Sequence, residues 1–328
     1  MNFPGETDAL EPNSEFVFPP KPGMQAAKPN AWVKSILSLA AYLVLGYFLF
    51  KRWEWLLLIT AIIIIHELGH FLAMKFFRYN DLGIFFIPLL GAYVSGTKRE
   101  VSQKESAIIL LAGPLPGIIA GIIMYLLWVN NPQLNIAGVS FYTVSLFFII
   151  LNLFNLLPVY PLDGGQLLNR VFFNEENWLS KGFIFLSILA LCWLAWKSNF
   201  PVLFIFPAFM LLRLIGEGRI NHIEKRIEEE NINTDCEYAD LPDEDYWRIR
   251  NILIEEYPSF KDVSPSPPYE YSHKEDKIME MVKTLLHRHL IQDVSVIGKI
   301  LVFIIWALAL ASPWLIDMDM SFFRRYSL

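Results

Sequence analysis

Long apolar runs, separated by short polar links, dominate residues 31–216 and return near the C-terminus. A helix needs about 20 mostly apolar residues to cross a bilayer, and seven runs meet or approach that length. The predicted spans are Ile36–Phe50 led in by Ala31–Ser35, Trp53–Phe77, Ala107–Val129, Val139–Leu162, Gly182–Trp196, Ser198–Leu212 and Ile300–Ile316. The pattern predicts an all-α polytopic membrane protein.

One apolar stretch, Ile84–Gly96, does not fit a span. It is too short to cross the membrane twice, and Pro88, Gly91 and Gly96 interrupt it. Such a segment is typical of a re-entrant or interfacial hairpin. Irregular backbone at that depth is tolerated only beside protein or a water-filled cavity, so the stretch also indicates a cavity.

Composition agrees with a membrane protein and shows where the charge lies. Of the 328 residues, 54% are hydrophobic and 18% charged, against about 25% charged in soluble domains. The net charge of -6 excludes a nucleic-acid binder built on a basic surface. Residues 217–297 hold 19 acidic and 10 basic residues, so the acidity belongs to one soluble stretch.

The predicted organisation follows from these runs and charges. It consists of a disordered N-terminal tail (1–30), a first span (31–52), a membrane core (53–172), a helical hairpin (173–216), a soluble acidic segment (217–297), a last span (298–317) and a C-terminal tail (318–328). Within the acidic segment, 223–232 reads as a helix extending the sixth span. Tyr257–Tyr271, with four prolines, reads as a linker, and Lys274–Gln292 as an amphipathic helix.

Basic residues in the loops predict the orientation. The link 130–138 carries no charge, whereas 97–105 holds Lys98, Arg99 and Lys104. Positive loops face the cytoplasm, which places 130–138 outside and makes the second and fourth spans end inside. Lys51 and Arg52 fall on the other side, against this rule. We expect a multi-pass protein, in the plasma (inner) membrane if bacterial.

The second predicted span contains the run His66-Glu67-Leu68-Gly69-His70. Residues four apart share one helix face, so both imidazoles can reach one metal ion, with Glu67 placed to take a proton from water. Zinc suits two neutral nitrogens and an oxygen, with a fourth position for water. A chance match is the competing explanation, but such polar groups in an apolar span are costly unless paired or functional.

A carboxylate is the natural third ligand, and Asp163 is the only acidic residue between Glu105 and Glu175. It lies at the inner end of the fourth span, at the side to which the second span descends. A second interpretation is that Asp163 only caps a helix beginning at Gly164.

Three motifs together resemble the site-2 protease family of intramembrane zinc metalloproteases, peptidase family M50. They are the run 66–70, Ala112-Gly113-Pro114-Leu115, and the series Asn155…Pro158…Asp163-Gly164. The resemblance covers about residues 54–172. It implies a three-span catalytic core in which His66, His70 and Asp163 hold one Zn²⁺ per chain.

By the same resemblance, Glu67 is the catalytic base and Asn155 lies near the substrate or transition state. The segment Ile84–Gly96 is similar to the membrane-inserted strand pair of the family. Many members have Asn where this chain has Gly117, which removes one expected polar contact. Gly113, Gly117 and Gly121 lie four apart, a spacing that favours close helix packing in lipid.

The sequence thus predicts an intramembrane zinc metalloprotease, active near the cytoplasmic face. Its expected partners are a transmembrane protein substrate and the lipid bilayer, without nucleic acid. A regulatory partner is one interpretation of 217–297, whose role stays open. Two other functions remain: a catalytically silent metal-binding scaffold that holds a partner span, and a metal transporter, in which intramembrane His and Asp mark the path.

Overall fold

The computed structural model describes residues 18–23, 31–87, 91–98, 100–173, 178–199, 201–286 and 290–318. The chain divides into two compact units. We call residues 26–215 and 288–328 the membrane unit, and residues 1–25 and 216–287 the acidic unit. Most of the two predicted tails, 1–30 and 318–328, lies outside the described residues.

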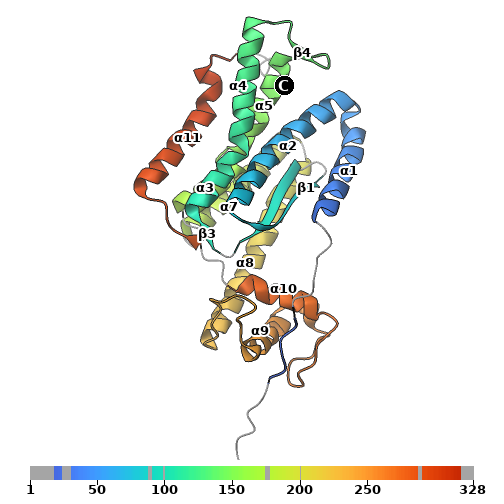
Figure 1. Ribbon diagram of the computed structural model, residues 1–328, viewed down its shortest axis with the longest axis vertical. Coiled ribbons are helices and arrows are strands. Elements are labelled where there is room, and N and C mark those ends of the chain that lie inside the picture. Colours follow the sequence, from blue (N-terminus) through green and yellow to red (C-terminus); the bar gives the residue numbers. More distant parts are fainter. Residues whose placement is uncertain are drawn as a thin grey trace, which may run out of the picture. The chain divides into compact units, whose positions relative to one another are not determined.

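The membrane unit is mainly helical. Its helices are α1 (Ala31–Phe50), α2 (Trp53–Phe76), α3 (Gln103–Ala112), α4 (Pro114–Asn130), α5 (Phe141–Asn155), α6 (Asp163–Leu167), α7 (Trp178–Lys197), the first part of α8 (Ile205–Glu229) and α11 (Val296–Leu315). A π-helical turn (Leu168–Phe173) follows α6, and a 3-10 turn (Pro201–Phe204) precedes α8. Figure 1 shows α4 beside α5, the pair in closest contact.

Four helical segments of the described residues are long and apolar enough to cross a membrane: α2, Gln103–Asn130, α7 and α11. Trp32–Phe48 and α5 are apolar but shorter. The predicted count of seven spans is therefore not confirmed. Hydropathy does not reveal where a helix ends: of Val139–Leu162 only 15 residues form α5, Val139–Ser140 form a short strand, and residues 156–162 form turns and bends that include Pro158 and Pro161.

The sixth predicted span, Ser198–Leu212, also differs from the structure. A 3-10 turn occupies its middle, and the helix that follows continues through charged residues to Glu229. The predicted helix at 223–232 is therefore largely the end of α8, as expected from its position after the sixth span.

Strands make all-α an incomplete description. β1 (Asn80–Ile87) and β2 (Gly91–Thr97) pair antiparallel, with Ile84 opposite Val94, where the sequence predicts a hairpin. Residues 88–90 lie outside the described residues, and the insertion of this hairpin into a membrane stays a prediction. Two-residue ladders join β3 (Val101–Ser102) to β6 (Leu290–Ile291) in parallel, and β4 (Asn135–Ile136) to β5 (Val139–Ser140) antiparallel.

The hairpin packs between α1 and α2 (Figure 1). The Phe86 amide donates to Ser38 Oγ at 3.1 Å, which ties β1 to α1. Phe86 also shares a buried apolar cluster with Tyr42 of α1 and Leu56 of α2. As β1 lies against α1, the other edge of the hairpin, formed by β2, lies on the α2 side.

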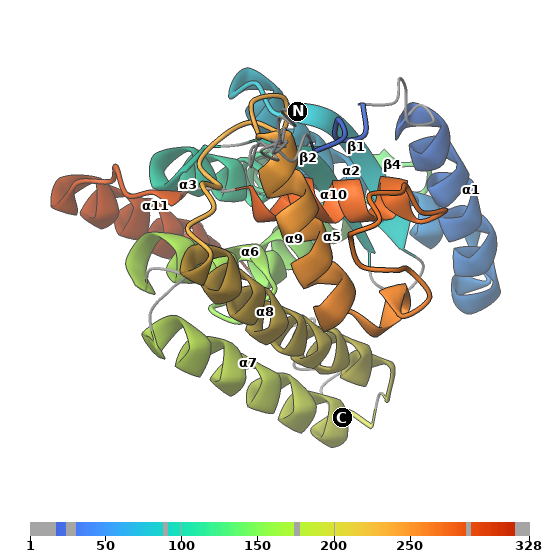
Figure 2. The same cartoon turned by 90° about the horizontal axis from the view of Figure 1, so that it is seen from below.

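Glycines let the core helices approach closely. A Cβ on Gly69 of α2 would lie 1.9 Å from the Ala112 carbonyl oxygen, and one on Gly121 of α4 would lie 2.6 Å from Ile149 Cγ1 of α5. Either side chain would force the helices apart. Figure 2 shows α7 alongside α8, whose contact buries Ile184, Leu191 and Met210.

The acidic unit has its own core, formed by the end of α8, by α9 (Asp243–Glu256) and by α10 (Glu275–Leu285), which crosses α9 (Figure 2). The segment 257–271 is not the predicted linker, because a 3-10 turn (Pro258–Phe260) buries Phe260 completely in this core. The predicted helix Lys274–Gln292 is shorter, ending at Leu285.

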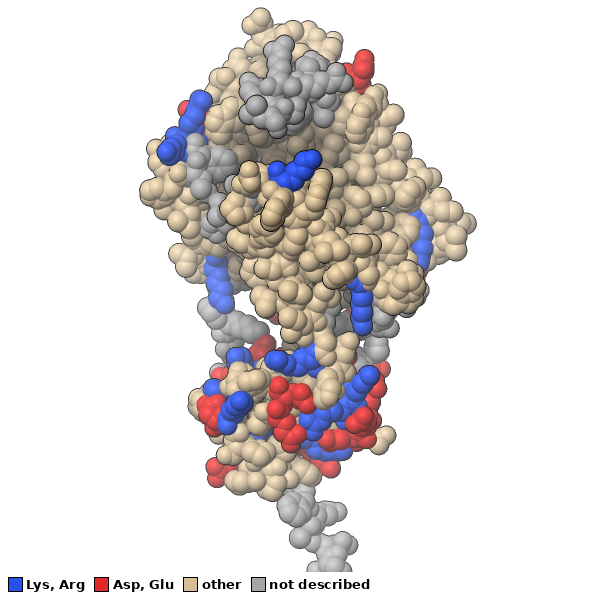
Figure 3. All heavy atoms as spheres, turned by 180° about the vertical axis from the view of Figure 1, so that it is seen from behind, with Lys and Arg blue, Asp and Glu red and all other residues tan. Residues whose placement is uncertain are grey.

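The surfaces differ as the sequence predicts. On the face shown in Figure 3, charged side chains are sparse on the membrane unit and dense on the acidic unit. The membrane unit instead exposes large apolar side chains such as Phe48, Trp196 and Ile297. Apolar surface of this extent marks contact with lipid or protein.

Candidate metal centre

His66, Glu67 and His70 lie in the second half of α2, after the apolar run Ile62–Ile65. Their exposed fractions are 6%, 6% and 8%, so all three polar side chains are buried. One helical turn separates the two histidines, and their ring centroids lie 4.8 Å apart. The single helix therefore presents two imidazoles side by side.

Asp163 reaches the same place from the first turn of α6. A Cβ on Gly164 would lie 2.0 Å from the Leu156 carbonyl oxygen, so glycine is needed for α6 to begin against the end of α5. The residue at the cap position is Leu162, and α6 has no side-chain cap hydrogen bond. The interpretation of Asp163 as a helix cap is therefore wrong.

The three side chains converge on one point. Asp163 Oδ2 lies 3.1 Å from His66 Nε2 and 3.3 Å from His70 Nε2, and the two Nε2 atoms lie 3.1 Å apart. Among the described residues these form a group of three whose ligand atoms lie within 4.8 Å of one another. The structure thus brings together the three residues expected to be ligands.

Hydrogen bonds on the far side of each ring fix its tautomer. His70 Nδ1 lies 2.8 Å from the Ile109 carbonyl oxygen, which can only accept, so Nδ1 carries the proton. His66 Nδ1 lies 2.8 Å from Asn152 Oδ1, and that amide is oriented because its Nδ2 donates to the Phe148 carbonyl at 2.7 Å. In the neutral form of each imidazole, Nε2 is therefore unprotonated and presents its lone pair.

Three lone-pair-bearing atoms consequently face one another in a buried place. Within the part of the chain that the structure describes, Asp163 Oδ2 is buried without a hydrogen-bond partner, a costly arrangement unless a cation lies among the three atoms. Bonds of about 2.0–2.2 Å in a tetrahedral zinc site hold ligand atoms about 3.3 Å apart. The observed separations of 3.1–3.3 Å fit a zinc ion.

Glu67 projects beside this group rather than into it. The Val94 amide of β2 lies within hydrogen-bonding reach of its carboxylate. The base expected from the sequence thus lies near both the ligand group and the backbone of β2.

Asn155 does not join the group. Its Nδ2 donates to the Leu151 carbonyl of its own helix at 3.2 Å, so its predicted role near the substrate stays a prediction. The residue that sequence reasoning missed is Asn152. Its only signal is an amide inside the apolar run of α5, one helical turn before Asn155.

Gly117 explains why Asn152 fits. A Cβ at position 117 would lie 2.2 Å from Asn152 Nδ2, so the absence of a side chain on α4 makes room for the amide from α5. Asn152 of α5 thus supplies an amide in place of the one that the family resemblance leads us to expect at position 117 of α4. Gly113 has a similar role, because its Cβ would lie 2.2 Å from His70 Nε2.

Fold and site together define a class: a helical membrane protein with a buried His-His-Asp group that could hold a metal ion, beside a glutamate. The model of peptidase family M50 matches residues 54–138. This match contains the histidines and the glutamate, and it ends before Asp163. Together with two relatives, it confirms the resemblance to peptidase family M50.

Two named proteins are similar in sequence to this chain. Stage IV sporulation protein FB of Bacillus subtilis is 28% identical over 194 residues, which cover 53% of this chain and 62% of the relative. A zinc metalloprotease of Methanocaldococcus jannaschii is 28% identical over 187 residues, covering 54% of each chain. The chain thus spans little more than half the length of either relative.

A solved site-2 protease from Methanocaldococcus jannaschii is similar at 24% identity, with a TM-score of 0.40. The match covers 54% of this chain and 84% of that chain.

Proposed function

We propose that this chain is a zinc metalloprotease that hydrolyses a peptide bond within or near a transmembrane segment of a membrane-protein substrate. The observation that carries the proposal is the convergence of one ligand atom each from His66, His70 and Asp163. The Asp163 atom is a buried carboxylate oxygen without a hydrogen-bond partner among the described residues. The family match and the zinc metalloprotease among the relatives support the same chemistry.

In this mechanism the chain's own residues hold and move protons. Bound zinc supplies a Lewis acid that acidifies water and polarises the scissile carbonyl. Glu67, adjacent in sequence to one ligand, takes the proton from the attacking water and later delivers it to the leaving amine. Asn152 and the Ile109 carbonyl keep the two imidazoles in the tautomer that offers Nε2.

The substrate has to be extended where it is cut. Carbonyls within a helix are occupied by hydrogen bonds, so a transmembrane substrate must unwind locally before attack. Among the described residues β2 is paired only with β1, and its Val94 lies beside Glu67. An unwound substrate segment is proposed to add to the β2 edge, by the pairing known as β-augmentation.

The proposal also places the reaction at a membrane boundary. The ligands lie in the part of α2 that precedes Lys75, its basic residue in the last turn. By the orientation predicted from the loop charges this end is cytoplasmic. Water then reaches the centre from the cytoplasmic side.

The test compares Glu67→Gln with Glu54→Gln, a change of an exposed glutamate on the same helix. Membrane proteomes of cells that carry each variant are compared with those of wild-type cells. We expect Glu67→Gln to keep its zinc and to lower cleavage by about 100-fold or more, so that intact substrate spans accumulate, whereas Glu54→Gln behaves as wild type.

Other outcomes lead to the other functions. Accumulation of no span in Glu67→Gln cells, with zinc still bound, would favour a silent scaffold. Uptake of zinc into proteoliposomes, and its loss from the protein on dialysis, would favour a transporter. Cleavage that persists in Glu67→Gln would remove Glu67 as the base.

A further inference from the structure

The N-terminal segment Phe18–Gly23, which we call the strap, does not fit the predicted disordered tail. It has no regular secondary structure, yet four of its six residues are partly buried in the acidic unit. It lies against four aromatic side chains, which we call the aromatic site: Tyr238, Trp247, Tyr269 and Tyr271.

Covalent chemistry fixes the conformation of the strap. Three of its residues are proline, at positions 19, 20 and 22. Each proline has φ near -65°, and the residue before a proline is held in extended geometry. A chain of this kind forms a polyproline II helix, which has no internal hydrogen bonds and leaves its carbonyls free for a partner.

The aromatic site supplies donors for those carbonyls. Trp247 Nε1 donates to the Pro19 carbonyl at 2.8 Å, and the Tyr238 hydroxyl donates to the Pro22 carbonyl at 2.9 Å. The Tyr271 hydroxyl donates to the Pro20 carbonyl. Three hydrogen bonds therefore bind backbone carbonyls of the strap and do not involve its side chains.

The N–H and the ammonium group of Lys21 also find partners. Lys21 has the only N–H between Pro19 and Pro22, and it donates to Asp243 Oδ1 at 2.8 Å. Its ammonium group donates to the carbonyls of Ala239, at 2.9 Å, and Leu241. The site thus matches an extended proline-rich segment that carries one cation.

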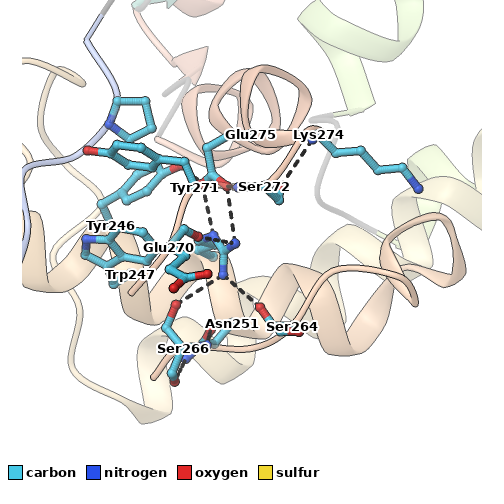
Figure 4. Close-up of polar contacts among 12 residues, drawn as sticks. Tyr246, Trp247, Asn251, Ser264, Ser266, Glu270, Tyr271, Ser272, Lys274 and Glu275 are labelled. Atoms are coloured by element: carbon cyan, nitrogen blue, oxygen red, sulfur yellow. Dashed lines mark hydrogen bonds and ion pairs between the residues drawn. The ribbon is translucent and has the colours of Figure 1, made fainter. Parts of the chain in front are cut away.

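A buried ion pair holds the aromatic site in shape. Arg250 is 1% exposed and donates to Glu275, to Ser266 Oγ and to the carbonyls of Ser264 and Glu270. Figure 4 shows these acceptors gathered beside Trp247 and Tyr271. The network fixes segment 264–275, which carries two of the four aromatic residues, against α9, which carries Trp247.

The charge state of this network is also fixed. Burial by itself would raise the pKa of Glu275, but the Arg250 guanidinium and the Tyr246 hydroxyl hold that pKa below its ordinary value. The Tyr246 hydroxyl donates to Glu275 at 2.5 Å. The carboxylate therefore remains ionised at neutral pH, and the aromatic residues above it keep one arrangement.

We propose that the aromatic site is a recognition site for extended proline-rich protein segments, which the strap occupies in cis until such a segment of a partner protein displaces it. Aromatic-lined grooves that bind polyproline II segments work in this way, because the ligand is already ordered before it binds. The proposal concerns the acidic unit alone and does not depend on proteolysis.

The test uses the full chain in detergent and a fluorescein-labelled peptide of residues 16–24, with binding measured by anisotropy. A cis segment acts at a millimolar effective concentration. We therefore expect the peptide to bind a chain lacking residues 1–23 at least about 10-fold more tightly than the intact chain. A peptide with alanine at its three proline positions should bind about 10-fold more weakly, because its polyproline II conformation is lost.

Two variants sharpen the result. Lys21→Glu in the intact chain should weaken the strap and raise the affinity for the added peptide. Tyr238→Phe in the truncated chain should lower that affinity about 2- to 10-fold, through the loss of one hydrogen bond. Hydrogen exchange of α9 amides reports whether the truncated chain keeps its fold.

Three results would overturn the proposal. The first is equal binding to the intact and truncated chains, or binding to neither. The second is loss of α9 protection on truncation, which would make the strap a part of the core that cannot be displaced. The third is an intact dimer that truncation converts to monomers, which would place each strap on a second copy.

Discussion

A buried polar cluster in the acidic unit and one in the membrane unit differ in how completely their polar atoms are satisfied. In the acidic unit, Arg250 and Glu275 are 1% and 6% exposed, and the guanidinium meets acceptors all around it. In the membrane unit, His66 and His70 are hydrogen-bonded through their outer nitrogens, while both inner nitrogens face Asp163 Oδ2, which has no hydrogen-bond partner among the described residues.

The difference separates a structural cluster from one built for a ligand. A buried polar network whose members are all paired rigidifies the fold around it. A buried carboxylate oxygen left beside two imidazole lone pairs costs free energy until a cation binds. The comparison thus supports the membrane unit as the place where a metal could bind, and a positioning role for the Arg250–Glu275 pair.

The largest expected effect in the acidic unit follows from breaking its ion pair. Arg250→Ala leaves the Glu275 carboxylate buried without its partner, which costs about 3–5 kcal/mol. We expect amides of α9 to exchange roughly 100-fold faster or more, as 1.4 kcal/mol corresponds to a factor of 10. Zinc content should not change.

Arg248→Ala is the matched control on the same helix. Arg248 pairs with Glu230 at 3.2 Å, but both side chains are more than a third exposed. Its removal should cost about 1 kcal/mol or less. Similar exchange in the two variants would show that the buried network does not hold the unit together.

A smaller effect is expected from changing Asn152, the residue that orients His66. Asn152→Leu removes the acceptor for His66 Nδ1, and loss of such a partner typically lowers metal affinity about 10- to 100-fold. Competition with a zinc chelator measures the change. The double variant Gly117→Asn with Asn152→Gly tests whether an amide on α4 restores the affinity.

Asn155→Leu is the control for this prediction. The Asn155 amide bonds within α5, so zinc affinity should be unchanged, while any role at the substrate would appear as slower cleavage. Equal loss of zinc in the Asn152 and Asn155 variants would contradict the assignment of Asn152 as the positioning residue for His66.

The candidate centre could be predicted from sequence because its polar and acidic residues lie in stretches that are otherwise apolar or free of acids. Two histidines and a glutamate in an apolar run, and one aspartate in a long stretch without other acids, are expensive unless functional. Asn152 carries no such signal, because a single amide in a helix can bond its own backbone, as Asn155 does. Only the approach of α5 to α2 distinguishes the two.

The fold was less predictable where helix-ending turns, or contacts with residues far away in sequence, determine the structure. α5 ends at Asn155, shortly before Pro158 and Pro161, inside a run that has no charge, so hydropathy extends the span too far. The strap looks like a disordered tail because prolines favour extended chain. Its order comes from Trp247 and Tyr238, more than 200 residues away in sequence.

X-ray absorption at the zinc edge of the purified chain tests the central claim most directly. We predict one zinc per chain, two imidazole ligands, and oxygen ligands at about 2.0–2.2 Å, with the zinc lost in Asp163→Ala. A sulfur shell at about 2.3 Å, which would bring in Cys192 or Cys236, would contradict it. So would an Asp163→Ala protein that keeps its zinc with an unchanged spectrum.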